Sequence, residues 1–441
     1  MKKNKNGKPP AAKRSALFKP AKTTYPILRQ LVQWIPEGLV QRLALKHKLD
    51  IRKFSANSHV VALLFAQIAL CDSLNTICDA ARQLAGAWRK IRGAEPPCRN
   101  TFSNANRTRD PKMAEDLFWE VYKHLSGTFQ TFTQNGPHKG FIFRFRHRIF
   151  AIDSTTLQLA LNCIDWAKHR RKKAAAKTHL RLDVGCRLPA FAIVETAAHH
   201  DSLRADELCA GLRDGDILLG DRAYTDFAFM RGLHERGVFF VLRAKRNMKF
   251  KTVRRLDRGM KQPDPGAAGP LADRTVTPAL PASRALCGGM TLRLVRARVE
   301  VDGKFIEMEF LTNNLEWAPR SVAELYRARW AIELFFKELK QTCQLQDFVG
   351  YNENAVRWQV WTALLAHLLL RFVAYLSKWR LSFSRLVGIV RHTLWVNRNL
   401  AEMLRCYGTA APPGAGEPSS KRVEKQGYFP FYARPYGTAT F

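Results

Sequence analysis

The sequence predicts an α/β protein in which a mixed sheet lies between two helical regions. Three observations support this class. Short apolar runs separated by turn residues follow one another through residues 139–243, as is typical of strands alternating with helices. Residues 244–315 hold two runs of alternating polarity around Asp302-Gly303, which predicts a β-hairpin. Long stretches before and after, 25–138 and 316–405, carry apolar residues at helical spacing.

The central region predicts a particular order of elements. Strand, strand, strand, helix, strand, helix, strand is the order that the polarity pattern favours. This order fits a ribonuclease-H-like mixed sheet. In such a sheet, the carboxyl ends of neighbouring parallel strands lie at the same edge. The five expected strands span residues 148–153, 180–185, 190–195, 217–219 and 239–242.

Changes in composition divide the chain into segments. The first carries eight Lys or Arg and no acidic residue, which predicts a disordered basic arm that could follow a DNA backbone or serve as a solubilising tail. Gly, Pro and Ser near the C-terminus predict a loose tail. The predicted segments are the arm 1–24, a helical DNA-binding domain 25–138, the first part of the core 139–243, a β-rich insertion 244–315, the second part of the core with C-terminal helices 316–405, and the tail 406–441.

Overall composition limits the partners and the compartment. The 441 residues include 72 Lys and Arg against 37 Asp and Glu, a net charge of +35 spread along the chain. Such an excess indicates a polyanionic partner, and nucleic acid is the first candidate. Nine cysteines without a Cys-x-x-Cys pair argue against a disulfide framework and favour a reducing cytosol. The longest apolar run, 362–370, is too short to span a membrane.

A polar stripe on one predicted helix, 319–344, carries the strongest functional signal. Tyr326, Arg329, Glu333 and Lys340 fall within about 60° of one another at about 100° per residue. A glutamate can hold a hard cation, and arginine and lysine can hold phosphate oxygens. A solvated helix face with an Arg329–Glu333 ion pair would give the same pattern.

Two aspartates shift the balance towards a catalytic site. Asp153 follows the apolar run 149–152, and Asp221 follows the short apolar run 217–219 and Gly220. Carboxylates at the ends of buried strands lie where ligands bind in open α/β sheets, although strand-ending aspartates are also common in turns. With Glu333 they make three carboxylates, enough for a pair of Mg²⁺ or Mn²⁺ ions in phosphoryl chemistry.

These residues together resemble the bacterial DDE transposases of the insertion-sequence-four (IS-four) family. Tyr326, Arg329, Glu333 and Lys340 match that family's Tyr-x2-Arg-x3-Glu-x6-Lys signature, and Asp153 and Asp221 match its first two catalytic aspartates. The likeness covers about residues 25–405. It implies a cut-and-paste transposase in which Asp153, Asp221 and Glu333 bind two Mg²⁺ ions, with Mn²⁺ able to substitute, and in which two subunits pair two DNA ends.

The resemblance also implies where double-stranded DNA, both element ends and target, would be held. Tyr326, Arg329 and Lys340 would contact phosphates near the cut. Relatives that cut through a DNA hairpin use an aromatic residue of the insertion to hold a flipped base; here that region has no Trp, and Phe240, Phe250 or Phe305 could substitute. The further DNA-binding candidates are Arg222, Lys172, Lys173, Arg246, Arg254 and Arg107.

Several alternatives remain open at this stage. A transposase-derived DNA-binding protein without catalysis, a metal-dependent endonuclease without strand transfer, and a basic RNA-binding protein all fit parts of the pattern. Asp201, in the run His199-His200-Asp201, could serve a metal or catalytic role, but the start of a helix favours an N-cap. The expected location is the bacterial cytoplasm, near the nucleoid, without a membrane.

Overall fold

The fold is that of a computed structural model. It describes residues 20–49, 54–134, 141–159, 168–170, 173–196, 200–257, 260–264, 266–301, 303–343 and 348–407. Most of the predicted basic arm and C-terminal tail, and Lys172, lie outside these ranges.

A single ten-stranded mixed sheet forms the centre of the protein. Its strands follow the order β2-β3-β1-β5-β6-β10-β9-β8-β7, and β4 also pairs with β3. β1 runs parallel to β5, and β5 parallel to β6; the other pairings are antiparallel. The strands are β1 (Ile149–Leu159), β2 (Lys168–Arg170), β3 (Lys173–Asp183), β4 (Leu188–Thr196), β5 (Ile217–Gly220), β6 (Phe239–Arg243), β7 (Phe250–Arg255), β8 (Gly269–Pro278), β9 (Leu292–Val301) and β10 (Lys304–Thr312).

The two faces of the sheet pack against different helices. Because side chains alternate along a strand, Ile149 and Ala151 of β1 join the larger core, whereas Phe150 and Ile152 join a smaller core on the opposite face. The larger core includes α13 (Pro319–Ala328) and α14 (Trp330–Thr342). The smaller core is covered by α10 (Ala205–Leu208), which follows η3 (Asp201–Arg204), by α11 (Phe227–Glu235), which follows η4 (Arg222–Tyr224), and by α12 (Pro281–Cys287).

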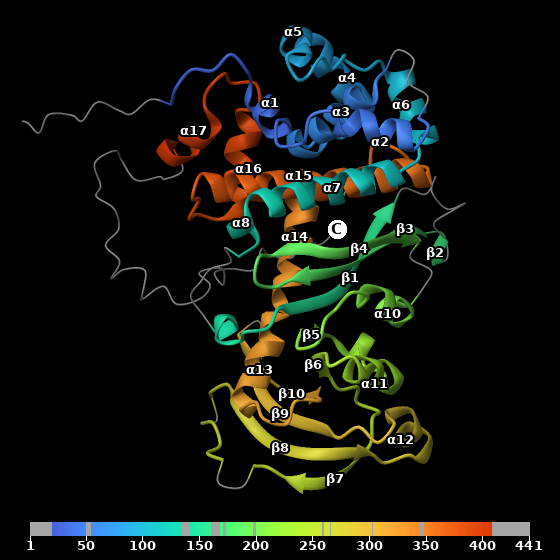
Figure 1. The fold of residues 1–441 in the computed structure, drawn as a ribbon, viewed down its shortest axis with the longest axis vertical. Helices are drawn as coiled ribbons and strands as arrows, with labels where there is room; N and C mark the ends of the chain where they lie inside the picture. The colour runs from blue at the N-terminus through green and yellow to red at the C-terminus, as the bar shows by residue number, and fades with distance from the viewer. Residues whose placement is uncertain are drawn as a thin grey trace, which may run out of the picture.

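A helical layer from both ends of the chain lies beyond one side of the sheet (Figure 1). The long helix α15 packs against α3, α6 and α7 and shares their core, so segments far apart in sequence lie side by side. The helices of this layer are α1 (Ile27–Val32), α2 (Leu39–Lys46), α3 (Ala56–Ala69), α4 (Leu74–Gln83), α5 (Ala85–Arg89), α6 (Arg99–Thr108), α7 (Lys112–Thr128), α8 (Gln130–Gln134), α15 (Glu353–Leu376), α16 (Phe383–His392) and α17 (Leu400–Tyr407). The short helix η1 (Phe141–Arg144) follows α8 and leads into β1.

By length and composition alone, α15 could cross a membrane, and the bent pair α3–α4 passes the same test together. Most of α15 is buried inside the protein, as in the core helix of a folded domain. It packs against α3, α6, α7 and α16, which accounts for its many apolar side chains.

Two expectations about local structure are wrong. The predicted helix 319–344 is divided at Arg329, where the amide of Arg329 donates to Tyr326 O at 3.1 Å and the amide of Ile332 donates to Arg329 O at 3.0 Å, both with three-residue spacing. The two halves have different packing partners: α13 lies on β6, β8 and β9, whereas α14 lies on β1 and α16. The first core strand is also longer than predicted, so Asp153 lies within β1 and not at its end.

The predicted hairpin is present, and its position links two parts of the chain. β9 pairs with β10, with Val301 opposite Lys304 and Gly303 at φ +72° in the connection. A positive φ is easily adopted by glycine. β10 in turn pairs with β6, so the strands between β6 and α13 extend the central sheet.

Candidate active site

The parallel pairing of β1 and β5 brings two predicted carboxylates to the same place. Ile152 of β1 lies opposite Gly220 of β5, and this is the last residue pair of the ladder. Asp153, the next residue of β1, and Asp221, the residue directly after β5, therefore lie beside the same pair. The backbone amide of Ser154 donates to Asp153 Oδ1 at 2.8 Å, and the amide of Ala223 donates to Asp221 Oδ1 at 2.8 Å. Both carboxylates are therefore held by local backbone groups.

Arg329 connects this sheet position to helix α14. Its Nη1 lies 3.2 Å from Asp153 Oδ2, and its Nη2 contacts Glu333 Oε1 one turn further along the chain. The side chain of Arg329 is 12% exposed. Burial alone would lower the pKa of Arg329, but the neighbouring Tyr326, Glu333 and Asp153 outweigh it and raise that pKa. The guanidinium thus forms a charged bridge between two of the three predicted carboxylates.

The pKa of Asp153 reflects the charges of both other predicted carboxylates, Asp221 and Glu333. Burial raises the pKa of Asp153 to about 6; Arg329 and the Ser154 amide oppose this shift, while the charges of Asp221 and Glu333 increase it. Three carboxylates share this region with one guanidinium, so negative charge is in excess. A cluster of this kind favours binding of a hard cation, which would relieve the repulsion.

In the part of the chain that the structure describes, no three His, Cys, Asp or Glu side chains converge closely enough to hold a metal ion as they stand. Arg329 lies between Asp153 and Glu333 and occupies the interaction that a cation would make with them. The donor set itself is nevertheless suitable, because it consists of carboxylate oxygens with uncompensated charge.

Tyr326 and Lys340 flank the bridge in different ways. The Tyr326 ring is buried, with its centroid 4.5 Å from that of Phe310, and the Arg329 guanidinium lies 5.5 Å from the Tyr326 ring centroid. Lys340 Nζ donates to Thr156 O of β1 at 3.2 Å, and partial burial lowers the pKa of its ammonium. Tyr326 therefore supports Arg329 through its ring, and Lys340 ties α14 to β1.

The remaining DNA-binding candidates are spread over the surface. Arg222 is exposed next to Asp221, Arg246 is exposed beyond the end of β6, Arg254 is exposed on β7, and Arg107 is exposed on α6. Lys173 begins β3, and Lys172 lies outside the described residues.

Two polar residues near Arg107 in the sequence are buried and have structural roles. Arg109 is buried and donates to the Phe54 carbonyl, and Asn106 is buried beside His59, with 2.8 Å between Asn106 Oδ1 and His59 Nε2.

The sequence interpretation of Asp201 as a helix cap is also wrong. His200 precedes η3 at the cap position, while the Asp201 carboxylate accepts a hydrogen bond of 2.6 Å from Ser154 Oγ. No local signal around Asp201 indicated this contact, because the two residues meet only through the tertiary fold.

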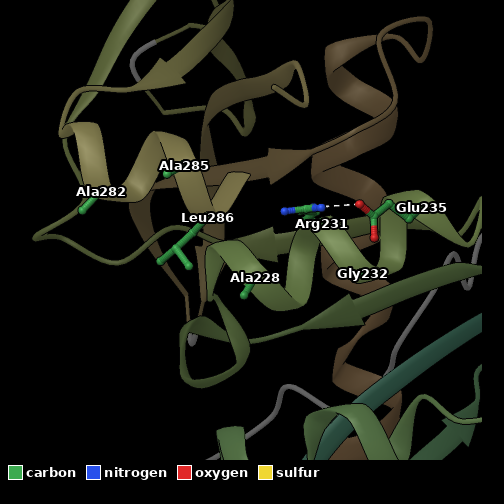
Figure 2. A pocket seen from close by; sticks show the side chains of 7 residues that line it. All are labelled: Ala228, Arg231, Gly232, Glu235, Ala282, Ala285 and Leu286. Atoms are coloured by element: carbon green, nitrogen blue, oxygen red, sulfur yellow. Dashed lines mark hydrogen bonds and ion pairs between the residues drawn. The ribbon is translucent and has the colours of Figure 1, made fainter. Parts of the chain in front are cut away.

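A separate hollow lies between α11 and α12 (Figure 2). Small side chains and Leu286 line it, and an ion pair between Arg231 and Glu235 crosses one side at 2.7 Å. It contains none of the predicted site residues.

Comparison with known proteins defines the class of the molecule. Residues 144–369, more than half of the chain, match the family described as transposase DDE domain. Residues 23–85 match a domain of unknown function, DUF4372. This is a DNA transposase, a phosphoryl-transfer enzyme that cleaves DNA and depends on divalent metal. The chain belongs to the transposase DDE domain family.

Two relatives by sequence agree with this assignment. The chain is 30% identical over 254 residues to "Putative transposase y4zB" of Sinorhizobium fredii, covering 58% of this chain and 68% of the relative. It is 26% identical over 264 residues to "Probable transposase for insertion sequence element IS5377" of Geobacillus stearothermophilus, covering 59% and 66%. A solved piggyBac transposase synaptic complex with hairpin DNA aligns at 12% identity and a TM-score of 0.42, covering 92% of this chain and 88% of that one.

Proposed function

We propose that this transposase cuts DNA at the ends of its insertion sequence, and joins the freed ends to target DNA, at a site formed by Asp153, Asp221 and Glu333. The observation that supports this proposal is the arrangement of these three carboxylates. Asp153 and Asp221 lie next to the last residue pair of the β1–β5 ladder, and Arg329 links Asp153 to Glu333 as their one cationic partner among the described contacts. A site of purely structural carboxylates would be balanced by cations. On this proposal the core has a ribonuclease-H-like arrangement of the IS-four kind.

The three carboxylates would hold Mg²⁺, two ions per site, with Mn²⁺ able to substitute. Such ions activate the attacking oxygen and neutralise charge on the phosphate during in-line displacement. Arg329 must release Asp153 when the carboxylates bind metal, and it is then free to hold a phosphate oxygen on the DNA. The ring of Tyr326 would keep the guanidinium close to the cut during this exchange.

Other basic residues would position the duplex around the cut. Lys340, on the same helix as Glu333, would neutralise a phosphate next to the reacting one, because the two residues are about 10 Å apart along the helix axis. Contacts to phosphates set the register of the DNA without reading its sequence. The proposed contacts further out come from Arg222, Lys172, Lys173, Arg246, Arg254 and Arg107.

Two copies of the chain would act together on two DNA ends. We include a homodimer in the proposal because each reaction product must be joined to the target beside its partner end. A protein that binds ends without cutting them, or that cuts without strand transfer, is the competing function. The complete set of three carboxylates favours catalysis over binding alone.

The test is metal-dependent nicking of a labelled duplex that carries the DNA flanking this gene. Wild type should cut at a defined terminal position in Mg²⁺, and Glu333→Ala should not. Glu324→Gln is the matched control, since Glu324 lies on α13 in a partly exposed ion pair with Arg320 at 3.1 Å. Cutting by Glu333→Ala would overturn the site, and tight end binding without any cut would favour the non-catalytic function.

A further inference from the structure

A row of basic side chains lies buried on the face of β3 opposite α14. Lys177, His179 and Arg181 alternate along the strand and point towards η3 and α10. Their exposure is low: 11% for the Lys177 side chain, none for the His179 side chain and 7% for Arg181. Buried charges are costly unless each has a partner, so the row requires acidic or carbonyl groups around it.

The partners of this row differ along its length. Arg181 Nη1 donates to the backbone carbonyls of Leu208 at 2.7 Å and Ala210 at 2.6 Å, which anchors α10 to the sheet. Lys177 Nζ instead lies 3.1 Å from Asp201 Oδ1. The Arg181 end of the row is thus a structural anchor, and the Lys177 end holds a carboxylate.

A second carboxylate completes the row. His179 Nε2 lies 3.0 Å from Glu195 Oε1, and Arg204 Nη2 lies 2.5 Å from Glu195 Oε2. Arg204 follows Asp201 in η3 and therefore fixes this short helix over the strands. Burial lowers the pKa of His179, with the Glu195 and Asp201 charges opposing the shift and Lys177 adding to it.

Asp201 connects this row to the proposed active site through Ser154. Its Oδ1 accepts a hydrogen bond of 2.6 Å from Ser154 Oγ on the smaller-core face of β1. The amide of the same Ser154 donates to Asp153 Oδ1 at 2.8 Å. Ser154 is therefore held through its side chain, while its backbone holds the catalytic carboxylate.

Tyr224 provides independent evidence that Asp201 is close to the two catalytic aspartates. Its side chain is 1% exposed. Burial first, and then the charges of Asp201, Asp153 and Asp221, raise the pKa of the Tyr224 hydroxyl well above its usual value. The charges of all three carboxylates therefore act on the same buried hydroxyl, in agreement with the hydrogen bond that joins Asp201 to Ser154.

We propose that Asp201 is a positioning residue that acts through Ser154 on the metal ligand Asp153. The contact with Lys177 holds the Asp201 carboxylate in place beside β1, and Ser154 transmits its position to Asp153. The inference rests on the proposed function of Asp153. It predicts that Asp201 and Ser154 act as one unit, whereas two residues that only add to stability would act separately.

The experiment is a double-mutant cycle in the full-length protein. The variants are Asp201→Ala, Ser154→Ala and the two combined. Asp206→Asn is the matched control, because Asp206 is exposed on α10. The readouts are the single-turnover cleavage rate of a DNA end at saturating DNA, binding of Mn²⁺ alone to the DNA-free protein, and the melting temperature.

Each single variant should lower both the cleavage rate and the Mn²⁺ affinity by about 10- to 100-fold, as is usual for residues that support metal ligands. The double variant should match the worse single variant within about twofold. Asp201→Asn keeps an acceptor for Ser154 Oγ and should fall between wild type and Asp201→Ala. Affinity for the DNA end should change much less than the rate.

Contrary results have distinct forms. Losses that multiply in the double variant, or Mn²⁺ affinity equal to that of Asp206→Asn, would overturn the proposal. If Asp201→Ala melts far below wild type, the milder Ser154→Ala and its Mn²⁺ affinity decide the question. If wild type fails to cut DNA, the proposed function fails, and the Mn²⁺ measurements still test the coupling between Asp201, Ser154 and Asp153.

Discussion

Helix α14 carries two glutamates whose surroundings differ sharply. Glu333 lies on the side of Asp153, to which Arg329 links it, and the charges of Glu333 and Asp221 both act on Asp153. Glu338, five residues further on, faces α15, where Arg371 Nη2 lies 2.5 Å and His367 Nε2 lies 3.1 Å from its Oε2. The two glutamates lie about 140° apart around the helix.

The difference shows in the pKa values on the two faces. Burial would raise the pKa of Glu338, but the hydrogen bond from His367 and the charge of Arg371 outweigh it and lower that pKa to about 2. At the Glu333 face, the pKa of Asp153 is raised to about 6. A compensated carboxylate stabilises the fold, whereas an uncompensated cluster remains available for a cation, and this contrast distinguishes structural from functional carboxylates.

The largest expected effect comes from replacing each glutamate by glutamine. Glu333→Gln should lower the cleavage rate at least about a thousandfold, because a catalytic ligand is lost, with little change in melting temperature. Glu338→Gln should cleave within about tenfold of wild type but melt lower. Single-turnover cleavage and calorimetry on both variants test this. Similar cleavage by the two variants would remove the distinction.

Arg329 should give the next largest effect. Arg329→Ala should lower cleavage about a hundredfold and also weaken binding to the specific DNA end, since both the bridge and a phosphate contact are lost. Gel-shift titration and cleavage on the same end separate the two. Arg327→Ala is the control, because Arg327 is a neighbouring arginine that is exposed on α13. If Arg329→Ala binds the DNA end as tightly as wild type but cleaves it more slowly, Arg329 acts only in the transition state.

At the compensated face the expected effect is on stability. Glu338→Gln should lower the free energy of unfolding by about 2–3 kcal/mol, because it leaves the partly buried Arg371 without its carboxylate partner. Urea denaturation at neutral pH measures this change. A loss below about 0.5 kcal/mol would show that the ion pair is dispensable.

The same face predicts a pH dependence of stability. The pKa of Glu338 falls from 4.5 to about 2 on folding, so its contribution is complete above about pH 4.5 and is lost as the pH falls towards 2. Wild type should lose more stability than Glu338→Gln between pH 5 and pH 3. Parallel urea midpoints for the two proteins over this interval would contradict the prediction.

The smallest expected effect is stabilisation by metal at the uncompensated face. At ten times its dissociation constant, a divalent ion should stabilise wild type by about 1.4 kcal/mol. A variant with Asp153→Ala and Asp221→Ala should gain nothing. Thermal melts with and without Mn²⁺ compare the two, and equal gains in both would place metal binding elsewhere.

Each of the three predicted carboxylates lies beside a local signal in the sequence. An apolar run precedes Asp153 and Asp221, and helical spacing groups Glu333 with Arg329. The structure places Asp153 and Asp221 next to the last residue pair of the β1–β5 ladder and links Asp153 to Glu333 through Arg329. Their roles in catalysis remain predictions for the experiments above.

Features that depend on tertiary partners could not be predicted in this way. The division of the helix at Arg329 arises because α13 and α14 pack on different strands, which helical periodicity does not encode. The contact between Asp201 and Ser154 joins residues 47 positions apart across two elements. Likewise, Arg109 has the sequence context of a DNA contact, yet its carbonyl partners lie on a distant segment.

The continuous hydrogen bonding of the sheet has a mechanical consequence. From β5 the ladder passes through β6, β10, β9 and β8 to β7 without interruption. Five steps at about 4.8 Å place β7 about 24 Å from Asp221's strand, roughly the length of seven base pairs. If DNA contacts β7 as proposed, this fixed separation along the sheet would set the distance between that contact and the cut made at the carboxylates.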